Sequence, residues 1–326
     1  MSKRIIIIHG RNTKPAQTPY EALQKRALIQ GIKRVNPSKA AALARGSIPI
    51  DFVYYGDVNN RLLSEVKKNR DDLTMTDPAH NNAPCLPHDE VEPAIIALAA
   101  IRKYNKSAYN KILRENTDFR WLDDAVRAFS TIAAITTATF LNMKAISHAT
   151  ADMGAYLLTR KVGSEVRARL QKQLVPALMN GDDICLIAHS MGCMVSYDVL
   201  WKLSRMSEYA NVRQGNPKVR LWLTLGCPLG EAGVKRNLYD GHERDRDRYP
   251  ENIIHDWVNI AAKDDFVAHD ATMKNDYRSM KRWGFVNSIT DKRIYNCYAS
   301  RRHSNPHKLY GYLAHGVVGD CVARWM

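Results

Sequence analysis

The sequence lacks the cysteine spacings that accompany zinc sites and redox motifs. Its six cysteines are well separated, with no C-x-x-C pair and no Cys/His spacing typical of zinc. Several lie in apolar runs, where a free cysteine packs as a small hydrophobic residue. We therefore expect no bound metal, and a reducing, cytoplasmic setting.

Long hydrophobic runs are also missing. The four isoleucines at 5–8 are too few for a signal-peptide core and are followed at once by His9 and Gly10. The uncharged stretch 128–143 is rich in Thr and Ala, and it falls short of the ~20 strongly apolar residues that a membrane span needs. We interpret it as a buried helix, with a mobile lid or a membrane-facing helix as the alternative.

Basic residues are abundant but not clustered. The chain has 48 Lys and Arg against 33 Asp and Glu, a formal net charge of +15, which favours an anionic partner such as a lipid surface. The cations are scattered from Lys3 to Arg324 without a run of five, and no nucleic-acid module is recognisable. We therefore expect a basic surface and no nucleic-acid ligand. The alternating charges of 242–248 (HERDRDR) are typical of a solvated loop or helix end.

Short apolar runs alternate with helical patterns along the 326 residues. The runs are rich in β-branched or aromatic residues and bounded by Gly, Pro, Asp or Asn, as buried parallel strands are. They lie at 5–8, 50–55, 184–188, 219–225, 257–262 and 294–298. Helical patterns occupy 20–35, 153–178, 194–203 and 315–325. This alternation predicts an α/β fold with a mostly parallel sheet flanked by helices.

One connection is far longer than a crossover between parallel strands requires. Roughly 125 residues separate the second and third strand patterns, where a few tens suffice. The stretch 59–90 is polar and marked by Pro and Asn, whereas 91–104 and 119–148 have helical patterns. We predict a helical cap or lid insertion at 59–149 on an α/β core formed by 1–58 and 150–326.

The segment 188–192 (AHSMG) lies where a strand pattern gives way to a helical one. A serine at the tip of a tight strand-to-helix turn needs small residues two positions before and after it, because the backbone there packs against neighbouring chain. Ala188 and Gly192 meet this requirement, with Ala188 at the first Gly of the usual G-x-S-x-G pattern. The alternative is that Ser190 only caps the following helix, a role that needs no partners elsewhere.

Candidate partners for the serine follow it in the chain. A serine hydroxyl is a weak nucleophile, so it needs a base within hydrogen-bond reach, and the base needs an acid that fixes its tautomer. Asp264 and Asp265 follow the fifth strand pattern, and His307 follows the sixth. His307 is favoured as the base over His303 and over His315, since His315 has a role available at the start of the last helix.

These motifs resemble those of the α/β-hydrolase superfamily, and within it the lipase- and esterase-like serine hydrolases. The resemblance covers the strand framework from Lys3 to Trp325, outside the insertion. It rests on 7–11 (IIHGR), 188–192 (AHSMG), the acidic turn 263–267 (KDDFV) and His307, which leads into an aromatic, Gly-containing helix start. It implies Ser190 as nucleophile and Asp265 as the acid at the better distance from its strand, with Asp264 as the alternative.

The resemblance also implies an oxyanion hole made of backbone N–H groups, on Met191 after the nucleophile and on Arg11 after the early H-G turn. It places His189 beside the turn, packed or hydrogen-bonded. The segment 225–230 (LGCPLG) resembles the G-S-P-L turn of some lipase-like relatives. We interpret it as a tight turn in preference to a site with a nucleophilic Cys227, because no dedicated His–Cys arrangement is visible.

Together these features predict a serine hydrolase that cleaves a carboxylic ester through an acyl-enzyme on Ser190, without a metal or organic cofactor. The apolar insertion favours a lipid or other small-molecule acyl ester as substrate. Two alternatives stay open. One is an acyltransferase on the same fold, and the other is a non-catalytic α/β-hydrolase-fold protein that binds a partner through its basic surface. The sequence leaves the oligomeric state unknown.

Overall fold

The computed structural model describes residues 2–12, 14–65, 151–263, 265, 268, 272–296, 298–300, 303–304 and 307–326. Apart from 59–65, the insertion expected at 59–149 lies outside the described residues. The uncharged stretch 128–143 and the alternative acid Asp264 lie outside them as well.

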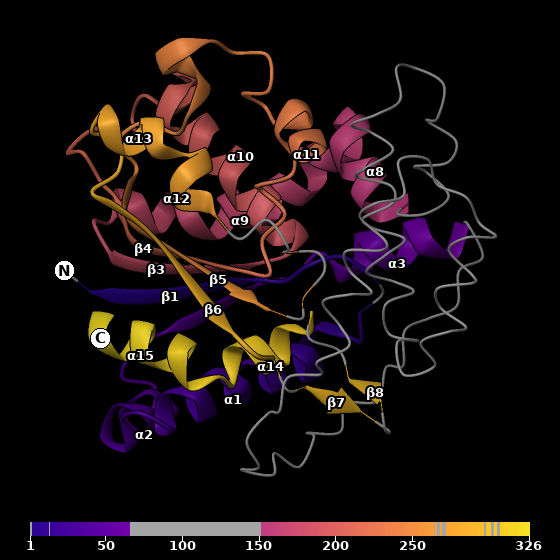
Figure 1. Ribbon diagram of the computed structural model, residues 1–326, viewed down its shortest axis with the longest axis vertical. Coiled ribbons are helices and arrows are strands. Elements are labelled where there is room, and N and C mark those ends of the chain that lie inside the picture. Colours follow the sequence, from indigo (N-terminus) through magenta and orange to yellow (C-terminus); the bar gives the residue numbers. More distant parts are fainter. Residues whose placement is uncertain are drawn as a thin grey trace.

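Six strands form one parallel sheet, as the sequence predicts (Figure 1). They are β1 (Lys3–Ile8), β2 (Ile50–Val53), β3 (Asp183–His189), β4 (Val219–Leu225), β5 (Ile254–Ala262) and β6 (Ser288–Ile294). Their order is β2-β1-β3-β4-β5-β6, and every neighbouring pair is parallel. The carboxyl ends of all six strands therefore lie at one edge of the sheet. A separate antiparallel hairpin pairs β7 (Ala299–Ser300) with β8 (His303–Ser304).

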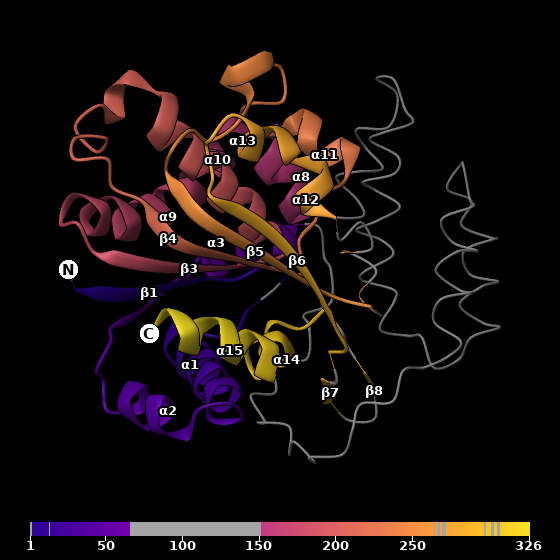
Figure 2. The same cartoon turned by 60° about the vertical axis from the view of Figure 1, so that its left-hand side comes forward.

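Helices cover both faces of the sheet, and Figure 2 shows the resulting three layers. One face carries α1 (Gln17–Lys33), α2 (Pro37–Ala44), α14 (Leu309–Leu313) and α15 (Gly316–Trp325). The other face carries α3 (Gly56–Glu65), α8 (Ala151–Leu158), α9 (Arg160–Met179), α10 (Met191–Arg205), α11 (Ala232–Asn237), α12 (Met273–Asp276) and α13 (Arg278–Arg282). Two short 3-10 helices, η2 (Ser207–Tyr209) and η3 (Asp245–Arg248), lie in connections, and 242–247 are exposed as expected.

The isoleucine run of β1 shows why the sheet is buried on both faces. Ile6 and Ile8 join the hydrophobic cluster beneath α9 and α10, whereas Ile5 and Ile7 join the cluster beneath α1 and α15. All four are 0 % exposed. A continuous apolar run is typical of a strand whose two faces are both covered. Burial of each such side chain stabilises the fold by about 1.5–3 kcal/mol.

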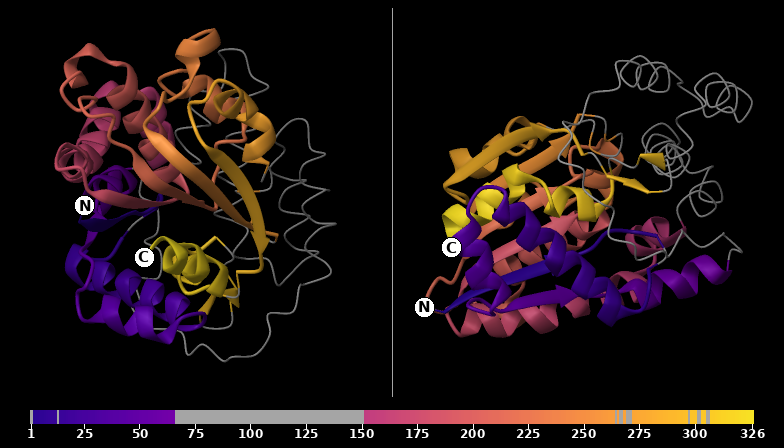
Figure 3. Two further views of the ribbon diagram at one scale, coloured as in Figure 1. Left: turned by 90° about the vertical axis from the view of Figure 1, so that its left-hand side faces the viewer. Right: turned by 90° about the horizontal axis from the view of Figure 1, so that it is seen from below.

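The chain termini lie close together at the amino ends of the strands, as the two views in Figure 3 show. The ammonium group of Lys3 lies 4.8 Å from the centre of the Trp325 ring and donates a hydrogen bond to the Trp325 carbonyl. The last helix begins where the sequence predicts, because His315 Nδ1 accepts a hydrogen bond from the backbone N–H of Val317, 3.1 Å away. The first and last elements are therefore anchored to each other.

Two predicted elements were wrong in detail. The pattern at 153–178 forms two helices, α8 and α9, which are separated at Thr159. The strand expected at 294–298 instead ends at Ile294, and β6 begins at Ser288. Because β6 lies at the edge of the sheet, only Ile289 and Ile294 are buried in it. Its other residues are polar or charged, so the strand contains no apolar run by which it could be predicted. Within the described ranges, no helix is both long and apolar enough to cross a bilayer.

Candidate active site

Ser190 occupies a strained turn between β3 and α10. Its backbone has φ 54° and ψ −125°, a conformation that costs a non-glycine residue about 1–3 kcal/mol. The turn is also tightly packed, since a Cβ at Gly192 would lie 2.6 Å from the carbonyl oxygen of His9. A Cβ at Gly10 would lie 2.7 Å from the Cβ of Ser190. The need for a small residue at position 192 therefore has a steric cause.

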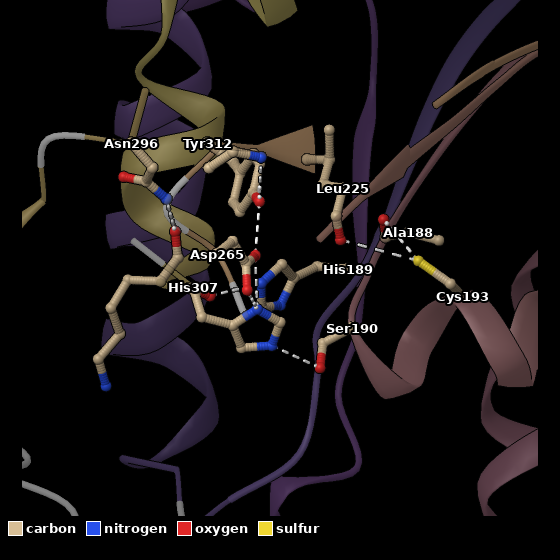
Figure 4. Close-up of polar contacts among 11 residues, drawn as sticks. Ala188, His189, Ser190, Cys193, Leu225, Asp265, Asn296, His307 and Tyr312 are labelled. Atoms are coloured by element: carbon tan, nitrogen blue, oxygen red, sulfur yellow. Dashed lines mark hydrogen bonds and ion pairs between the residues drawn. The ribbon is translucent and has the colours of Figure 1, made fainter. Parts of the chain in front are cut away.

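The Ser190 side chain does not cap α10. It makes no capping hydrogen bond, and its Oγ lies 2.8 Å from His307 Nε2 (Figure 4). The first turn of α10 is closed by a backbone hydrogen bond instead, in which the N–H of Cys193 donates to the Ser190 carbonyl at 2.8 Å. The capping interpretation is therefore wrong, and the hydroxyl is directed at a histidine 117 positions further along the chain.

Asp265 completes a hydrogen-bonded chain with His307. The imidazole Nδ1 lies 2.9 Å from Asp265 Oδ1 and 2.8 Å from Oδ2 (Figure 4). The Asp265 side chain is 0 % exposed and that of His307 is 17 % exposed. A buried carboxylate accepts only, so it keeps the proton on Nδ1 and leaves Nε2 with a lone pair for the serine hydroxyl.

The other histidines considered as base have different positions. His315 caps α15, and His303 lies in the short strand β8. His307 follows that hairpin and lies two residues before α14, which packs on the same face of the sheet as α1 and α15. His307 follows β6 in the chain as expected, and the hairpin β7–β8, which the sequence analysis did not predict, lies between them.

The turn after β4 lies against the acid and the base. Gly226 has φ +54°, and a Cβ there would lie 2.9 Å from Asp265 Oδ2 and 3.1 Å from the His307 ring. Both the backbone conformation and the space therefore require glycine. Cys227, the next residue, is 1 % exposed and is a free thiol. The interpretation of 225–230 as a tight turn agrees with this geometry, but the closeness of Gly226 to the site was not anticipated.

His189 is hydrogen-bonded beside the turn, as expected. Its Nε2 lies 2.7 Å from the carbonyl oxygen of His307, so Nε2 carries the proton and donates. Burial, and then the nearby His307, lower the pKa of His189 well below 6.5, so the ring is neutral. Its Nδ1 is buried without a partner among the described residues. His189 therefore holds the backbone of the proposed base from the residue that precedes the serine.

His9 holds the early H-G turn in place. Its Nε2 accepts a hydrogen bond from the backbone N–H of Tyr55 at 3.1 Å, so its Nδ1 carries the proton and donates to the Gly10 carbonyl at 2.7 Å. Burial lowers the pKa of His9 well below 6.5. This neutral, fully buried ring fixes the backbone that leads to Arg11.

The two N–H groups expected to bind an oxyanion lie at the ends of these turns. Met191 is the first residue of α10, and its N–H donates to no group in the part of the chain that the structure describes. The carbonyl oxygens of Arg11 and Asn12 both accept from the ammonium group of Lys14, which holds their loop folded back. The roles of Met191 and Arg11 in binding an oxyanion remain predictions.

Two residues beside the hydrogen-bonded chain of Ser190, His307 and Asp265, which we call the triad, were missed by the sequence analysis. The hydroxyl of Tyr312, in α14, donates to Asp265 Oδ2 at 2.6 Å. The amide of Asn296 donates to the Lys308 carbonyl at 3.0 Å and so holds the chain just after His307. The aromatic, Gly-containing start of α14 was the only feature of the sequence that could have pointed to Tyr312. Nothing in the sequence distinguishes Asn296 as a residue of the site.

No family model matches the chain, and neither the curated proteins nor the solved structures include a match. Among the residues that the structure describes, no group of three or more His, Cys, Asp or Glu is arranged to hold a metal ion. The assignment of the site therefore depends on the geometry of this chain alone.

Proposed function

We propose that this protein is a serine hydrolase of the α/β-hydrolase superfamily, similar to lipases and esterases, which cleaves a carboxylic ester through an acyl-enzyme on Ser190. The observation that carries the proposal is the unbroken hydrogen-bonded chain from Ser190 Oγ through the His307 ring to the Asp265 carboxylate. A hydroxyl, an imidazole and a buried carboxylate in this order are the arrangement that activates serine for attack on a carbonyl.

The reaction proceeds in two halves. Ser190 Oγ attacks the ester carbonyl carbon while its proton passes to His307 Nε2, and the developing oxyanion is stabilised by the N–H groups of Met191 and Arg11. The C–O bond to the alcohol then breaks, and His307 returns the proton to the leaving oxygen. Water, deprotonated by His307, attacks the acyl-enzyme in the same way and releases the acid and the free serine.

Backbone strain supports catalysis over the alternative of a silent binding protein. Ser190 holds an unfavourable φ of 54°, and Asp265 is a carboxylate with no exposed side-chain surface. The strained backbone destabilises the fold, the buried carboxylate needs donors such as His307 to offset its desolvation, and a binding module would require neither feature. Acyl transfer to an acceptor other than water would use the same three side chains, so it remains an alternative that only competition between acceptors separates from hydrolysis.

The substrate class is inferred from the sequence of the insertion. Its apolar, uncharged stretch 128–143 lies outside the described residues, and it favours a lipid or other acyl ester over a small polar one. The net charge of +15 favours an anionic lipid surface as the place where such an ester is met. We propose a cytoplasmic location on the cysteine spacing alone.

A fluorophosphonate probe tests the proposed function, since it labels only an activated serine. We expect the parent protein and a Ser207→Ala control to be labelled, because Ser207 is an exposed serine at the start of η2. A Ser190→Ala variant with an unchanged melting temperature should not be labelled. Labelling that survives this substitution, or is absent from the parent protein, contradicts the proposal. p-Nitrophenyl esters of graded chain length, with and without added alcohol acceptors, then define the acyl group and separate hydrolysis from transfer.

A further inference from the structure

The hydroxyl of Tyr312 links the acid of the triad to the end of a central strand. It lies 2.6 Å from Asp265 Oδ2 and 2.9 Å from the backbone nitrogen of Ala262, the last residue of β5 (Figure 4). The Tyr312 side chain is 0 % exposed. No substrate therefore touches this hydroxyl, whose effect on the reaction is through Asp265.

The direction of these two hydrogen bonds is fixed by chemistry. A backbone N–H only donates, so the Tyr312 oxygen accepts from Ala262. The single hydroxyl proton is then left for Asp265 Oδ2, which as a carboxylate only accepts. Tyr312 is thus a donor to the charged acid and an acceptor from the N–H of Ala262.

The position of Tyr312 is set by a close helix crossing. A Cβ at Gly31, in α1, would lie 2.2 Å from the carbonyl oxygen of Leu313, so α14 packs directly on the backbone of α1. A Cβ at Gly311 would lie 1.8 Å from Asn296 Oδ1, so α14 is also fixed against the segment after β6. Helix α14 therefore cannot move away from Asp265 without losing both contacts.

We propose that Tyr312 is a positioning residue, which orients the Asp265 carboxylate and takes a share of its negative charge, and so sets how tightly His307 holds the proton from Ser190. The inference rests on the proposed function. Two donors, His307 Nδ1–H and Tyr312 O–H, meet at Oδ2, and charge-assisted hydrogen bonds of this kind are about twice as strong as neutral ones. A carboxylate with one donor fewer is freer to rotate and attracts the imidazolium more strongly.

A Tyr312→Phe variant tests this role, because it removes only the hydroxyl. We expect kcat to fall by about ten- to a hundredfold with KM unchanged, since the lost bond involves a charged group and no substrate contact. We also expect the acid limb of the kcat/KM profile to move to higher pH, because the imidazolium is held more tightly. Replacement of Tyr312 by 3,5-difluorotyrosine, a stronger donor, should move the same limb to lower pH.

Tyr156→Phe is the matched control. The Tyr156 hydroxyl donates to the buried Asp198 at 2.6 Å, the same length, and neither residue belongs to the triad. This control should lose thermal stability and keep the parent pH profile. A Tyr312→Phe variant that loses stability alone, or changes KM alone, would overturn the inference, and so would an acid limb that moves to lower pH.

Proton NMR separates this inference from the proposed function. The strongly downfield signal of the proton between His307 and Asp265 requires no substrate. We expect it to shift in Tyr312→Phe and to stay in place in Tyr156→Phe. If the fluorophosphonate fails to label Ser190 while this signal responds to Tyr312, the proposed function fails and the contact remains. If labelling occurs and the signal is unmoved, only the role of Tyr312 is overturned.

Discussion

The Nε2 atom of His189 donates a hydrogen bond to the carbonyl oxygen of His307, 2.7 Å away. The residue before the proposed nucleophile thus holds the backbone of the proposed base. The two rings are 4.8 Å apart between centres, so the buried His189 ring also packs against that of His307. Nothing in the local sequence requires this contact, which joins β3 to the segment that precedes α14.

His189→Phe should therefore slow the reaction of Ser190 with a fluorophosphonate without emptying the space beside the turn. It keeps a ring but loses the donor, and a neutral hydrogen bond contributes about 0.5–1.5 kcal/mol. We expect the rate of fluorophosphonate labelling to fall between about twofold and tenfold. His189→Gln, which places an amide N–H near the position of Nε2, should recover most of the lost rate. Equal rates in Phe and Gln variants would show that the hydrogen bond has no effect.

Gly226→Ala should impair the site more than backbone strain alone explains. The added methyl group would lie 2.9 Å from Asp265 Oδ2 and 3.1 Å from the His307 ring, so these side chains must shift. Gly181→Ala is the matched control, because Gly181 has φ +68° and nothing within 4 Å of its Cβ position. Both variants should lose about 1–2 kcal/mol of folding stability from the left-handed backbone. Only Gly226→Ala should lose labelling at Ser190, and equal labelling in the two would contradict the proposed contact.

The strands β1 and β3, which lead to the site, were predictable because their residue types reflect their burial. The apolar run of β1 and the one ending at Ala188 are buried on both faces, so hydrophobicity alone marks them. The turn at Ser190 was also predictable, since packing against His9 leaves no room for a side chain at Gly192. Burial and close backbone packing restrict which residues can occupy these positions, so the local sequence is enough to predict them.

The parts that escaped prediction depend on contacts between distant segments. Strand β6 is half solvated at the sheet edge, so its residues carry little apolar signal. Tyr312 meets Asp265 across 47 positions of chain, and Gly226 meets the same carboxylate from the turn after β4. A tyrosine in a short helix and a glycine in a turn can each serve many structural roles. Only the three-dimensional arrangement shows that both residues contact Asp265.

A buried carboxylate away from the triad gives the protein a pH-dependent stability. Burial raises the pKa of Asp240 from 3.8 to about 7, and the hydroxyl of Tyr197 and the charge of Arg248 only partly oppose the shift. The folded protein therefore keeps a proton that the unfolded chain releases between about pH 4 and pH 7. Stability from this group is present below about pH 4 and declines as the pH rises to about 7, by up to about 1.4 kcal/mol per pH unit.

Asp240→Asn should reduce that decline. The free energy of unfolding, measured with urea at pH 5 and pH 7, should fall less with rising pH in the variant than in the parent protein. The exposed Asp245 serves as the control site, and Asp245→Asn should leave the difference between the two pH values unchanged. Asp198, whose pKa burial raises to about 6, remains in both proteins, so part of the decline should persist.

Substitution of the proposed acid is the most direct test of the triad. In Asp265→Asn the amide oxygen can still accept from Tyr312, which turns the amide N–H₂ group toward His307 Nδ1. Two N–H donors cannot pair, so the imidazole must move its proton to Nε2, where it can no longer accept from Ser190 Oγ. The wrong tautomer costs about 10⁴-fold in kcat in enzymes with this arrangement. We expect a loss of this order in Asp265→Asn with little change in melting temperature, and near-parent kcat in Asp264→Asn. The reverse pattern would transfer the role of the acid to Asp264.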